Sequence, residues 1–375
     1  MKVGIDARFY GPRVKGLGRY LQKLIENLEN LEKNSNNEFY IFLTKEGYER
    51  YNPQSKNFHK ILADFSWYGW KEQLAFPFFL YKHKLDLMHF GHFNVPWLYR
   101  EKFVVTIHDL ILFHYPTFKN STLSRFYYLV KMVAYRFIIN SSVKRARKVI
   151  AVSDFTKRDV LNNFKIEKDK VEVVKEGYEI EKKEQGSDPE TILKKYGIVK
   201  PYLLYVGNAY PHKNLERLIL AFDLLRNAYP NLNLILVGGE DYFYRRLKRF
   251  VGERETEGVC FTGFVEDADL KTVYKEAECL VFPSLYEGFG LPPLEALACE
   301  CPVVSSGKTS MSEVLGEAAE YFDPEKPELI KEATEKVLNN PKRRKEILNK
   351  GKERIKNFNW QETGRKTLQV YKKSL

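Results

Sequence analysis

The chain has 375 residues, of which 44% are hydrophobic and 29% charged, and its formal net charge is +12. This composition excludes an intrinsically disordered chain, and the length predicts two compact domains rather than one. No stretch reaches the roughly 18 uninterrupted apolar residues that a membrane-spanning helix needs.

The positive charge is concentrated in the first half of the chain. Residues 1–178 hold 30 Lys and Arg against 18 Asp and Glu, whereas residues 179–375 hold 31 of each. Such a basic half attracts nucleic acid, an anionic bilayer or a pyrophosphate-bearing acceptor through the same field. Charge alone leaves these three partners open.

The four cysteines favour a reducing compartment. None of them forms a CxxC pair, and Cys299 and Cys301 are too close in sequence for an easy disulfide. No secretory leader precedes Lys2, so we expect a cytoplasmic protein, with peripheral attachment to the inner face of a membrane as an option.

Short apolar runs alternate with amphipathic runs from end to end, the pattern of parallel sheets crossed over by helices. Strands are expected at residues 3–6, 39–43, 85–90, 103–108, 148–152 and 171–174, and again at 202–206, 233–237, 259–262, 279–283, 302–305 and 319–322. The polar segment 179–200 reads as a linker between the two sets. The sequence therefore predicts an α/β chain of two Rossmann-like doubly wound domains that face an interdomain cleft.

Two glycines open the first predicted helix. Gly16 and Gly18 follow the strand at 3–6 and precede Arg19 and Tyr20. Glycines at this point let the backbone approach a ligand closely. The third glycine of a dinucleotide fingerprint is missing, so we expect no nicotinamide cofactor.

Histidines stand near the ends of two predicted strands of the first half. His108 and Asp109 end one strand, where side chains of a parallel sheet reach the ligand-binding edge. His89 lies in the strand at 85–90 and His92 follows it, and both are expected to line the cleft rather than to bind metal. We expect no metal and no other cofactor.

Two aromatic segments of the first half permit two interpretations each. Residues 126–139 form an apolar run broken by Lys131 and Arg136, which suits either a helix in the membrane interface or a helix packed on the core. Residues 65–79 contain Trp67, Tyr68 and Trp70, which indicate a hydrophobic or sugar-stacking acceptor surface as an alternative to core packing.

The second half contains a Gly-rich junction between two glutamates. Glu287 and Glu295 stand eight apart in the run SLYEGFGLPPLEALACECPVVSS, at residues 284–306. A strand that leads through a Gly-rich turn into a helix presents backbone N–H groups and the positive end of a helix dipole, which suit a diphosphate. Sugar and ribose hydroxyls donate well to carboxylates. The pattern therefore predicts a nucleotide-sugar site.

This run resembles the E-x7-E motif of retaining glycosyltransferases of family 4, which have the GT-B fold. Six further segments are similar to landmarks of that family, with IHDL and PHKN resembling bacterial mannosyltransferase-like enzymes of surface-polysaccharide assembly: VGIDARFY with KGLGRY, VVTIHDLILFHYP, VIAVSDFTKRDV, YVGNAYPHKNLERLI, LILVGG and VCFTGFVEDADL. The resemblance implies an acceptor-binding domain at 1–180, a nucleotide-sugar-binding domain at 181–358 and a last helix at 359–375 that crosses back to the first domain.

The resemblance also implies roles for single residues. It makes His108, Lys213 and Glu287 catalytic, with Lys213 on the donor diphosphate, His108 on the donor sugar or reacting centre and Glu287 near the sugar hydroxyls. Asp109, Arg19 and Tyr20 are expected on the acceptor side. Donor binding is expected from Gly16, Gly18, Asn208, His212, Gly263, Phe264, Val265, Gly288, Phe289, Gly290, Leu291 and Glu295.

The chain departs from the family pattern at two of these positions. Asn208 and His212 stand where many family members carry an arginine, so one phosphate clamp is expected to be weaker. A histidine that protonates near neutral pH would make activity pH-dependent.

The resemblance implies a retaining, metal-independent transfer of a hexose, with mannose from GDP-mannose favoured, to a lipid-linked or polysaccharide acceptor. Within the same fold, a UDP- or ADP-glucose-dependent synthase or a sugar epimerase is the alternative. Outside it stand a basic nucleic-acid-binding protein, for which no recognised module is visible, and a noncatalytic partner subunit. We expect no nucleic-acid partner.

Overall fold

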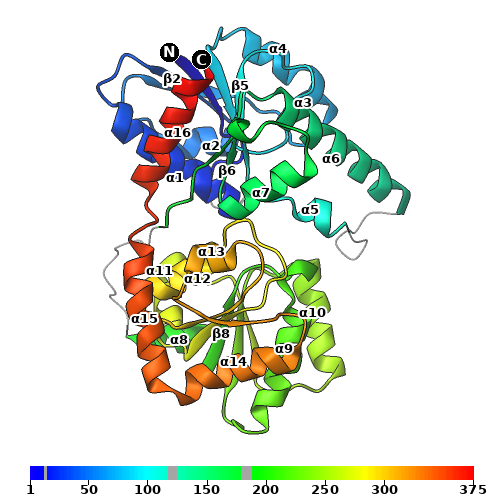
Figure 1. Ribbon diagram of the computed structural model, residues 1–375, viewed down its shortest axis with the longest axis vertical. Helices are drawn as coiled ribbons and strands as arrows, with labels where there is room; N and C mark the ends of the chain where they lie inside the picture. Colours follow the sequence, from blue (N-terminus) through cyan, green and yellow to red (C-terminus); the bar gives the residue numbers. More distant parts are fainter. Residues whose placement is uncertain (12–14, 117–124, 179–187) are drawn as a thin grey trace. The chain divides into compact units, whose positions relative to one another are not determined.

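Residues 1–11, 15–116, 125–178 and 188–375 are described by the computed structural model of the chain (Figure 1). They divide into a first unit, Met1–Gly177 with Asn359–Leu375, and a second unit, Tyr178–Phe358. The predicted boundary at 180 lies three residues beyond this division, and the predicted last segment begins at the same residue, Asn359. Residues 179–187 of the predicted linker lie outside the described residues.

The first unit is built on a parallel sheet with the strand order β3-β2-β1-β4-β5-β6-β7. Its strands are β1 (Lys2–Asp6), β2 (Glu38–Leu43), β3 (Phe58–Leu62), β4 (Leu87–Phe90), β5 (Phe103–Ile107), β6 (Lys148–Ala151) and β7 (Val171–Val173). Its helices are α1 (Lys15–Glu32), α2 (Lys45–Arg50), α3 (Trp70–Leu74), α4 (Phe76–Tyr81), α5 (Ile111–His114), α6 (Arg125–Arg145), α7 (Asp154–Asn163) and α16 (Trp360–Ser374), with a 3₁₀ turn at Lys168–Lys170.

The second unit has a parallel sheet with the strand order β10-β9-β8-β11-β12-β13. Its strands are β8 (Tyr202–Val206), β9 (Asn233–Val237), β10 (Val259–Gly263), β11 (Cys279–Phe282), β12 (Val303–Ser306) and β13 (Glu320–Phe322). Its helices are α8 (Pro189–Lys195), α9 (Leu215–Arg226), α10 (Tyr242–Glu253), α11 (Asp267–Lys275), α12 (Leu291–Ala298), α13 (Met311–Leu315), α14 (Pro327–Asn339) and α15 (Pro341–Ile355), with a 3₁₀ turn at Pro211–Lys213.

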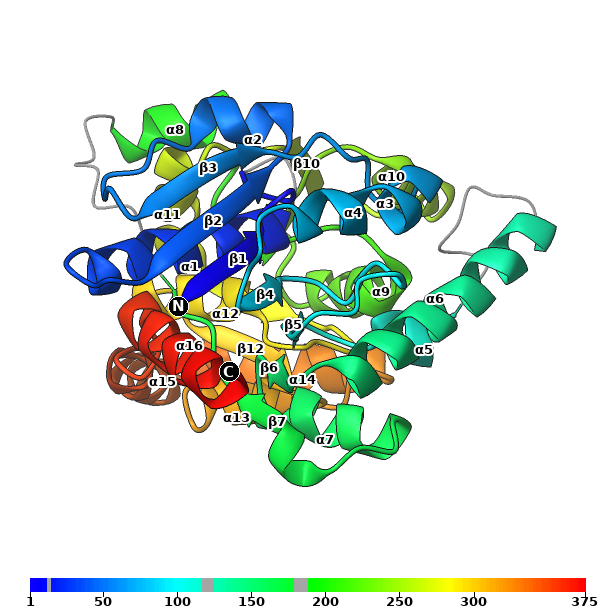
Figure 2. The same ribbon diagram turned by 90° about the horizontal axis from the view of Figure 1, so that it is seen from above.

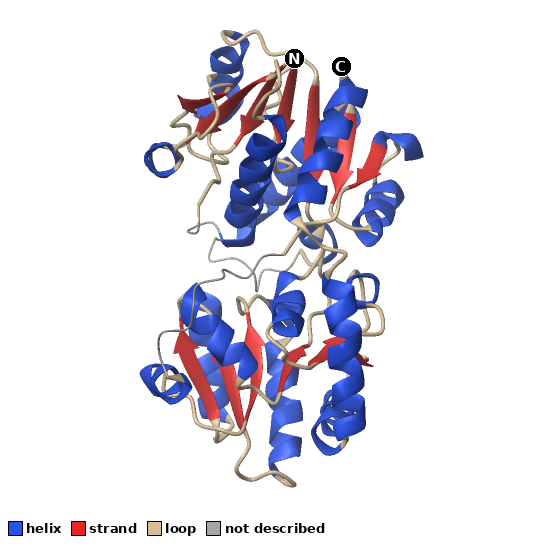
Figure 3. Ribbon diagram, turned by 90° about the vertical axis from the view of Figure 1, so that its left-hand side faces the viewer, coloured by secondary structure: helices blue, strands red, loops and turns tan. Residues whose placement is uncertain are grey.

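Both sheets lie between layers of helices (Figure 3). The central strands β4, β5 and β11 are buried along their whole length, which explains their continuous apolar sequences. The edge strand β3 is only partly buried and carries His59 and Lys60. Its mixed composition is why the sequence pattern did not predict a strand there.

The last helix belongs to the first unit, as the resemblance implied. Helix α16 packs beside α1, where Gly364 lets it approach Asn27 and Leu31 (Figure 2). The hydroxyl of Tyr371 hydrogen bonds to Nδ1 of His89 at 2.7 Å, which anchors the end of the chain against β4.

Each sheet has one point at which the strand order reverses direction. In the first unit this switch lies between β1 and β4, and in the second between β8 and β11. Ligands of doubly wound folds bind outside the carboxyl ends of the strands at such switch points. The loops after these four strands are therefore the first places to look for a site.

Candidate functional site

The loops after β8 and β11 bring Lys213 and Glu287 together. The Nζ atom of Lys213 donates a 2.5 Å hydrogen bond to Oε1 of Glu287, and the two side chains are only 14% and 9% exposed. Lys213 ends the 3₁₀ turn Pro211–Lys213, and its ammonium also lies 5.6 Å from the centre of the Phe282 ring. The switch point of the second sheet thus holds a nearly buried, oppositely charged pair.

The backbone of Glu287 is fixed by the loop after β12. Its N–H donates to Oγ1 of Thr309 at 3.1 Å, and its carbonyl accepts from the hydroxyl of Ser310 at 3.0 Å. Thr309 has a left-handed φ of 62°, an unfavourable conformation for a β-branched residue. Sequence reasoning missed both hydroxyl residues, although their position just after a buried strand was a usable signal.

Helix α12 starts at the Gly-rich junction, as the sequence predicts. Gly290 has a φ of 87°, a conformation that other residues rarely adopt, so the tight entry into the helix favours glycine. Leu291 is the first helical residue, while the ring of Phe289 is buried against Phe358. Of the first three helical positions only Leu291 carries a backbone N–H, because Pro292 and Pro293 have none. This N–H and that of Gly290, at the N-cap, are the backbone donors suited to an anion at this helix start.

Glu295 lies in the second turn of α12 and is partly buried. Its Oε2 accepts a 3.1 Å hydrogen bond from the hydroxyl of Tyr274, which lies on α11. The pKa of Tyr274 is raised well above its ordinary value, mainly by burial and secondly by the negative charge of Glu295. The phenol therefore stays protonated and continues to donate. Tyr274 orients the carboxylate and was not predicted.

The two positions that depart from the family pattern are placed differently. Asn208 is partly exposed in the loop after β8, where its carbonyl accepts from Tyr205. His212 is 5% exposed, and burial, followed by the charge of Lys213, lowers its pKa to about 3. His212 is therefore neutral at physiological pH, and the expectation that its protonation makes activity pH-dependent is wrong.

The loop after β10 presents the three residues that were predicted to meet the base. Gly263 has a φ of 73° and open space where a side chain would stand, and its carbonyl accepts from Gly238. Phe264 is 72% exposed, whereas Val265 is buried. An aromatic face and an open glycine backbone stand together at the carboxyl edge of the second sheet.

In the first unit, Gly16 and Gly18 have different surroundings. A Cβ atom on Gly18 would lie 1.9 Å from the carbonyl oxygen of Gly11, so this glycine allows the start of α1 to pack on the preceding loop. A Cβ on Gly16 would meet nothing within 4 Å, and Gly16 is exposed. Only Gly16 leaves an open approach for a ligand.

Both ring nitrogens of His108 are engaged within the first unit. Nδ1 lies 2.9 Å from Oε1 of Glu176, and Nε2 lies 3.1 Å from the carbonyl oxygen of Gly91. Burial acts to lower the pKa of His108, but the hydrogen bond and charge of Glu176 outweigh it and raise the pKa. An imidazolium that donates at both nitrogens fits these partners, and the role of His108 at the donor sugar stays a prediction.

Tyr20 packs against the ring of His108. It is 1% exposed, its ring meets the His108 ring edge-on at 4.6 Å, and its hydroxyl shares a 3.2 Å hydrogen bond with Thr106. The expectation that Tyr20 contacts an acceptor is therefore wrong, because the packing of α1 on β5 encloses it. Arg19 and Asp109 remain partly exposed, and Oδ1 of Asp109 accepts a 2.9 Å hydrogen bond from the N–H of Ile111, the first residue of α5.

His89 is a core residue rather than a lining residue. It is fully buried between Tyr371 and Thr106, and burial, followed by the charge of His108, lowers its pKa to about 3. The pKa of His92 is likewise lowered to about 3 by burial, and its ring packs on Phe9 and Phe93.

A buried ionic network at the carboxyl edge of the first sheet was not predicted. Arg8 makes two 2.8 Å hydrogen bonds to the carboxylate of Asp6 and a third, of 2.7 Å, to Glu72. The other oxygen of Glu72 accepts from the backbone N–H of Tyr68 at 2.7 Å and from Asn94 at 2.6 Å. This network fixes Tyr68, which is 59% exposed and has a left-handed φ of 59°.

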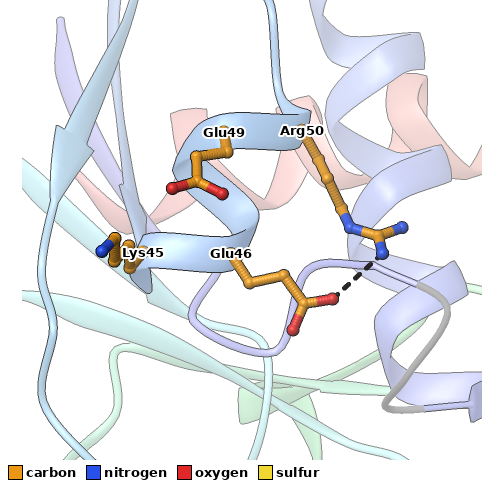
Figure 4. A pocket seen from close by; sticks show the side chains of 4 residues that line it. All are labelled: Lys45, Glu46, Glu49 and Arg50. Atoms are coloured by element: carbon orange, nitrogen blue, oxygen red, sulfur yellow. Dashed lines mark ion pairs between the residues drawn. The ribbon is translucent and has the colours of Figure 1, made fainter.

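Two surface hollows contain none of the predicted residues. One is lined by Lys45, Glu46, Glu49 and Arg50, whose charges cancel and two of which pair at 3.1 Å (Figure 4). The other lies where strands of the second sheet begin, the edge opposite to Lys213, and is lined by residues such as Pro201 and Glu278. Neither is a candidate site.

The described part of the chain holds neither a cluster of metal ligands nor a helix that could span a membrane. Within residues 1–11, 15–116, 125–178 and 188–375, no three His, Cys, Asp or Glu side chains cluster as metal ligands would. In the same ranges, every helix is too short or too polar to cross a bilayer.

Comparison with known proteins places the chain in a family. Residues 14–182 match the model of Glycosyltransferase Family 4, and residues 188–354 match that of Glycosyl transferases group 1. The O-antigen chain mannosyltransferase B of Escherichia coli is 31% identical over 279 residues, which cover 72% of this chain and 70% of that protein. The chain belongs to the family 4 glycosyltransferases.

Further relatives of this glycosyltransferase agree. The O-antigen chain mannosyltransferase RfbU of Salmonella typhimurium is 30% identical over 264 residues, covering 69% of this chain and 67% of that protein. Among solved structures, sucrose-phosphate synthase from Thermosynechococcus elongatus superposes with a TM-score of 0.77 at 21% identity, covering 99% of this chain and 98% of that one. WaaG, a glycosyltransferase involved in lipopolysaccharide biosynthesis, gives a TM-score of 0.73 at 16% identity with 99% of each chain covered. These structures establish the GT-B fold.

Proposed function

We propose that this glycosyltransferase is a retaining mannosyltransferase that uses GDP-mannose without a metal ion. Its acceptor is a lipid-linked or growing polysaccharide at the cytoplasmic face of a membrane. The single observation that carries the proposal is the nearly buried Lys213–Glu287 pair at the switch point of the second sheet. The choice of mannose is supported by relatives named O-antigen mannosyltransferases.

Each part of the donor has a complementary group in the second unit. The Lys213 ammonium and the N–H groups of Gly290 and Leu291 at the start of α12 suit the diphosphate, whose negative charge grows as the glycosidic bond breaks. The carboxylate of Glu287 suits sugar hydroxyls, and that of Glu295 suits ribose hydroxyls. The open backbone of Gly263 and the exposed ring of Phe264 suit the base.

The transfer step follows from this distribution of charge. The bond from the anomeric carbon to the phosphate oxygen breaks, and its electron pair leaves with the diphosphate, which Lys213 stabilises. The acceptor hydroxyl attacks from the same face and passes its proton to the departing phosphate oxygen. Glu287 is held by Lys213 through its carboxylate, which favours a role in positioning over nucleophilic attack.

A donor panel tests this proposal. We expect GDP-mannose to raise the melting temperature of the full chain more than UDP-glucose or ADP-glucose does, because a ligand of the folded state stabilises it. Product configuration by NMR should show retention, and transfer should persist in EDTA. Preference for a UDP- or ADP-sugar would redirect the assignment to a different synthase, and a covalent sugar on Glu287 would overturn the mechanism.

A further inference from the structure

Large apolar side chains are exposed together on the first unit. Eight of them form what we call the apolar surface: Trp70, Leu74, Phe78, Trp97, Leu129, Val130, Val133 and Phe137. Trp70 is 84% exposed and Val133 is 69% exposed. Contiguous exposed apolar surface on this scale marks an interaction site.

Contacts between the elements make this surface continuous. The backbone N–H of Trp97 donates to the side chain of Gln73, on α3, at 2.9 Å. The Trp97 ring lies 6.2 Å from the ring of Phe137, on α6. Figures 1 and 2 both place α3, α4 and α6 on the same side of the first unit.

Helix α6 has an apolar outer stripe in addition to a core face. At about 100° per residue, Leu129, Val130, Val133 and Phe137 fall within about 100° of one another around the helix axis. The opposite face is buried, through residues such as Tyr128, Met132, Tyr135 and Ile139. Core packing therefore explains only one side of this helix.

The charges that border the apolar surface are basic. Helix α6 contains five Lys or Arg residues and no acidic residue, and residues 87–100 contain none either, while the exposed Glu101 follows Arg100. Lys131 is exposed on α6, and the guanidinium of Arg100 lies 4.8 Å from the centre of the Trp97 ring. Aromatic and aliphatic side chains bordered by cations suit the interface of an anionic bilayer.

We propose that the apolar surface docks the first unit on an anionic lipid bilayer, with the apolar side chains in the interface and the cations on lipid headgroups. A second copy of the chain is a poorer occupant, because a two-fold contact would bring two basic surfaces together. The proposal deepens the proposed function, since a lipid-linked acceptor is presented at such a surface.

Vesicle sedimentation of the full chain tests the docking surface. We expect binding to vesicles of phosphatidylglycerol and phosphatidylethanolamine, weaker binding in high salt, and little binding to phosphatidylcholine alone. The double variant Trp70→Ser with Phe137→Ser should bind at least about tenfold more weakly, because two apolar anchors are lost. Lys131→Glu should weaken binding to the anionic vesicles alone.

Val199→Ser is the matched control, because Val199 is 64% exposed but lies in the second unit. The melting temperature and the affinity for GDP-mannose are measured for every variant and should equal those of the wild type. This control separates the test of the surface from the test of the donor site. Equal sedimentation of the double variant and the wild type would overturn the proposal. The proposal would also be overturned if the wild type dimerised but did not bind vesicles, and the double variant no longer dimerised. Vesicle binding without donor binding would instead retain the surface and reject the proposed function.

Discussion

Nδ1 of His108, at the end of β5, lies 2.9 Å from Oε1 of Glu176, which follows β7 two strands away in the same sheet. The pair therefore connects the loop after the inner strand β5 with the segment after the edge strand β7. Burial alone would lower the pKa of His108, and the partnership with Glu176 reverses the direction. The charge of one candidate catalytic residue is therefore set by a carboxylate 68 positions along the chain.

Replacing Glu176 by Gln should lower the pKa of His108, because burial would no longer be opposed by a carboxylate. A raised histidine pKa adds stability that is complete below about pH 6.5 and is lost as pH rises through the folded-state value. The variant should therefore lose most stability at acidic pH and approach the wild type at alkaline pH. Histidine ring NMR against pH and urea unfolding at pH 6 and pH 9 measure both effects. Glu172→Gln, which removes a partly exposed carboxylate of β7, is the control, and an unchanged His108 pKa in Glu176→Gln would contradict the assignment.

The two glycines that open α1 should respond differently to alanine. Gly18→Ala places a methyl group against the backbone carbonyls of Gly11 and Phe9, which cannot move away as a side chain can. We expect a loss of more than about 2 kcal/mol and a fall in melting temperature of several degrees. Gly16→Ala meets open space, so folding should be retained while close approach of a ligand is hindered. Reduced transfer with normal stability in Gly16→Ala is the expected signature, and equal instability of both variants would remove the distinction.

Much of the fold could be predicted because buried parallel strands leave continuous apolar runs. All six strands of the second sheet lie where the runs predict them, for example β8 at Tyr202–Val206. Strand β3 was missed because an edge strand is buried on fewer sides and tolerates residues such as His59 and Lys60. The position of α16 came from family resemblance, since nothing in its own amphipathic pattern specifies which unit it covers.

The candidate site could be predicted only where a side chain belongs to a local motif. Glu287, Gly290 and Glu295 fall in one short run, and Lys213 follows a strand. The residues that hold them, such as Thr309 and Tyr274, come from other loops and helices, and only the folded sheet brings them close. For His212 the residue type suggested protonation near neutral pH, but burial lowers its pKa, and burial cannot be read from the local sequence.

Substitution of Glu287 and of Glu295 should change different kinetic constants. Glu287→Gln removes the carboxylate that holds Lys213, so we expect kcat to fall by about 10²- to 10³-fold. Glu295→Gln should mainly raise the KM for the donor, by about 10- to 100-fold, which corresponds to the loss of a charged hydrogen bond. Steady-state kinetics with varied GDP-mannose separate the two. Glu276→Gln, which breaks an exposed pair with Lys200, is the control, and unchanged kinetics in both motif variants would remove the site assignment.

Tyr68 offers a last test, on the acceptor. Its ring is exposed at the carboxyl edge of the first sheet, and its backbone is held in a left-handed conformation by the buried Glu72. Strained exposed residues persist where the surrounding structure holds them for a purpose, and aromatic faces stack well on saccharides. Tyr68→Gly should relieve the backbone strain, and so preserve or raise stability by up to about 1 kcal/mol, while raising the KM for the acceptor.

Hydrolysis of GDP-mannose in the absence of acceptor should be unchanged in Tyr68→Gly, because the proposed donor site lies in the second unit. Tyr68→Trp keeps an aromatic face and should retain more transfer than Tyr68→Gly at the same acceptor concentration. Tyr242→Ala removes an exposed tyrosine from α10 and serves as the control. An acceptor KM that is the same for Tyr68→Gly and the wild type would show that the strain serves folding of this loop alone, since the donor reaction is measured separately.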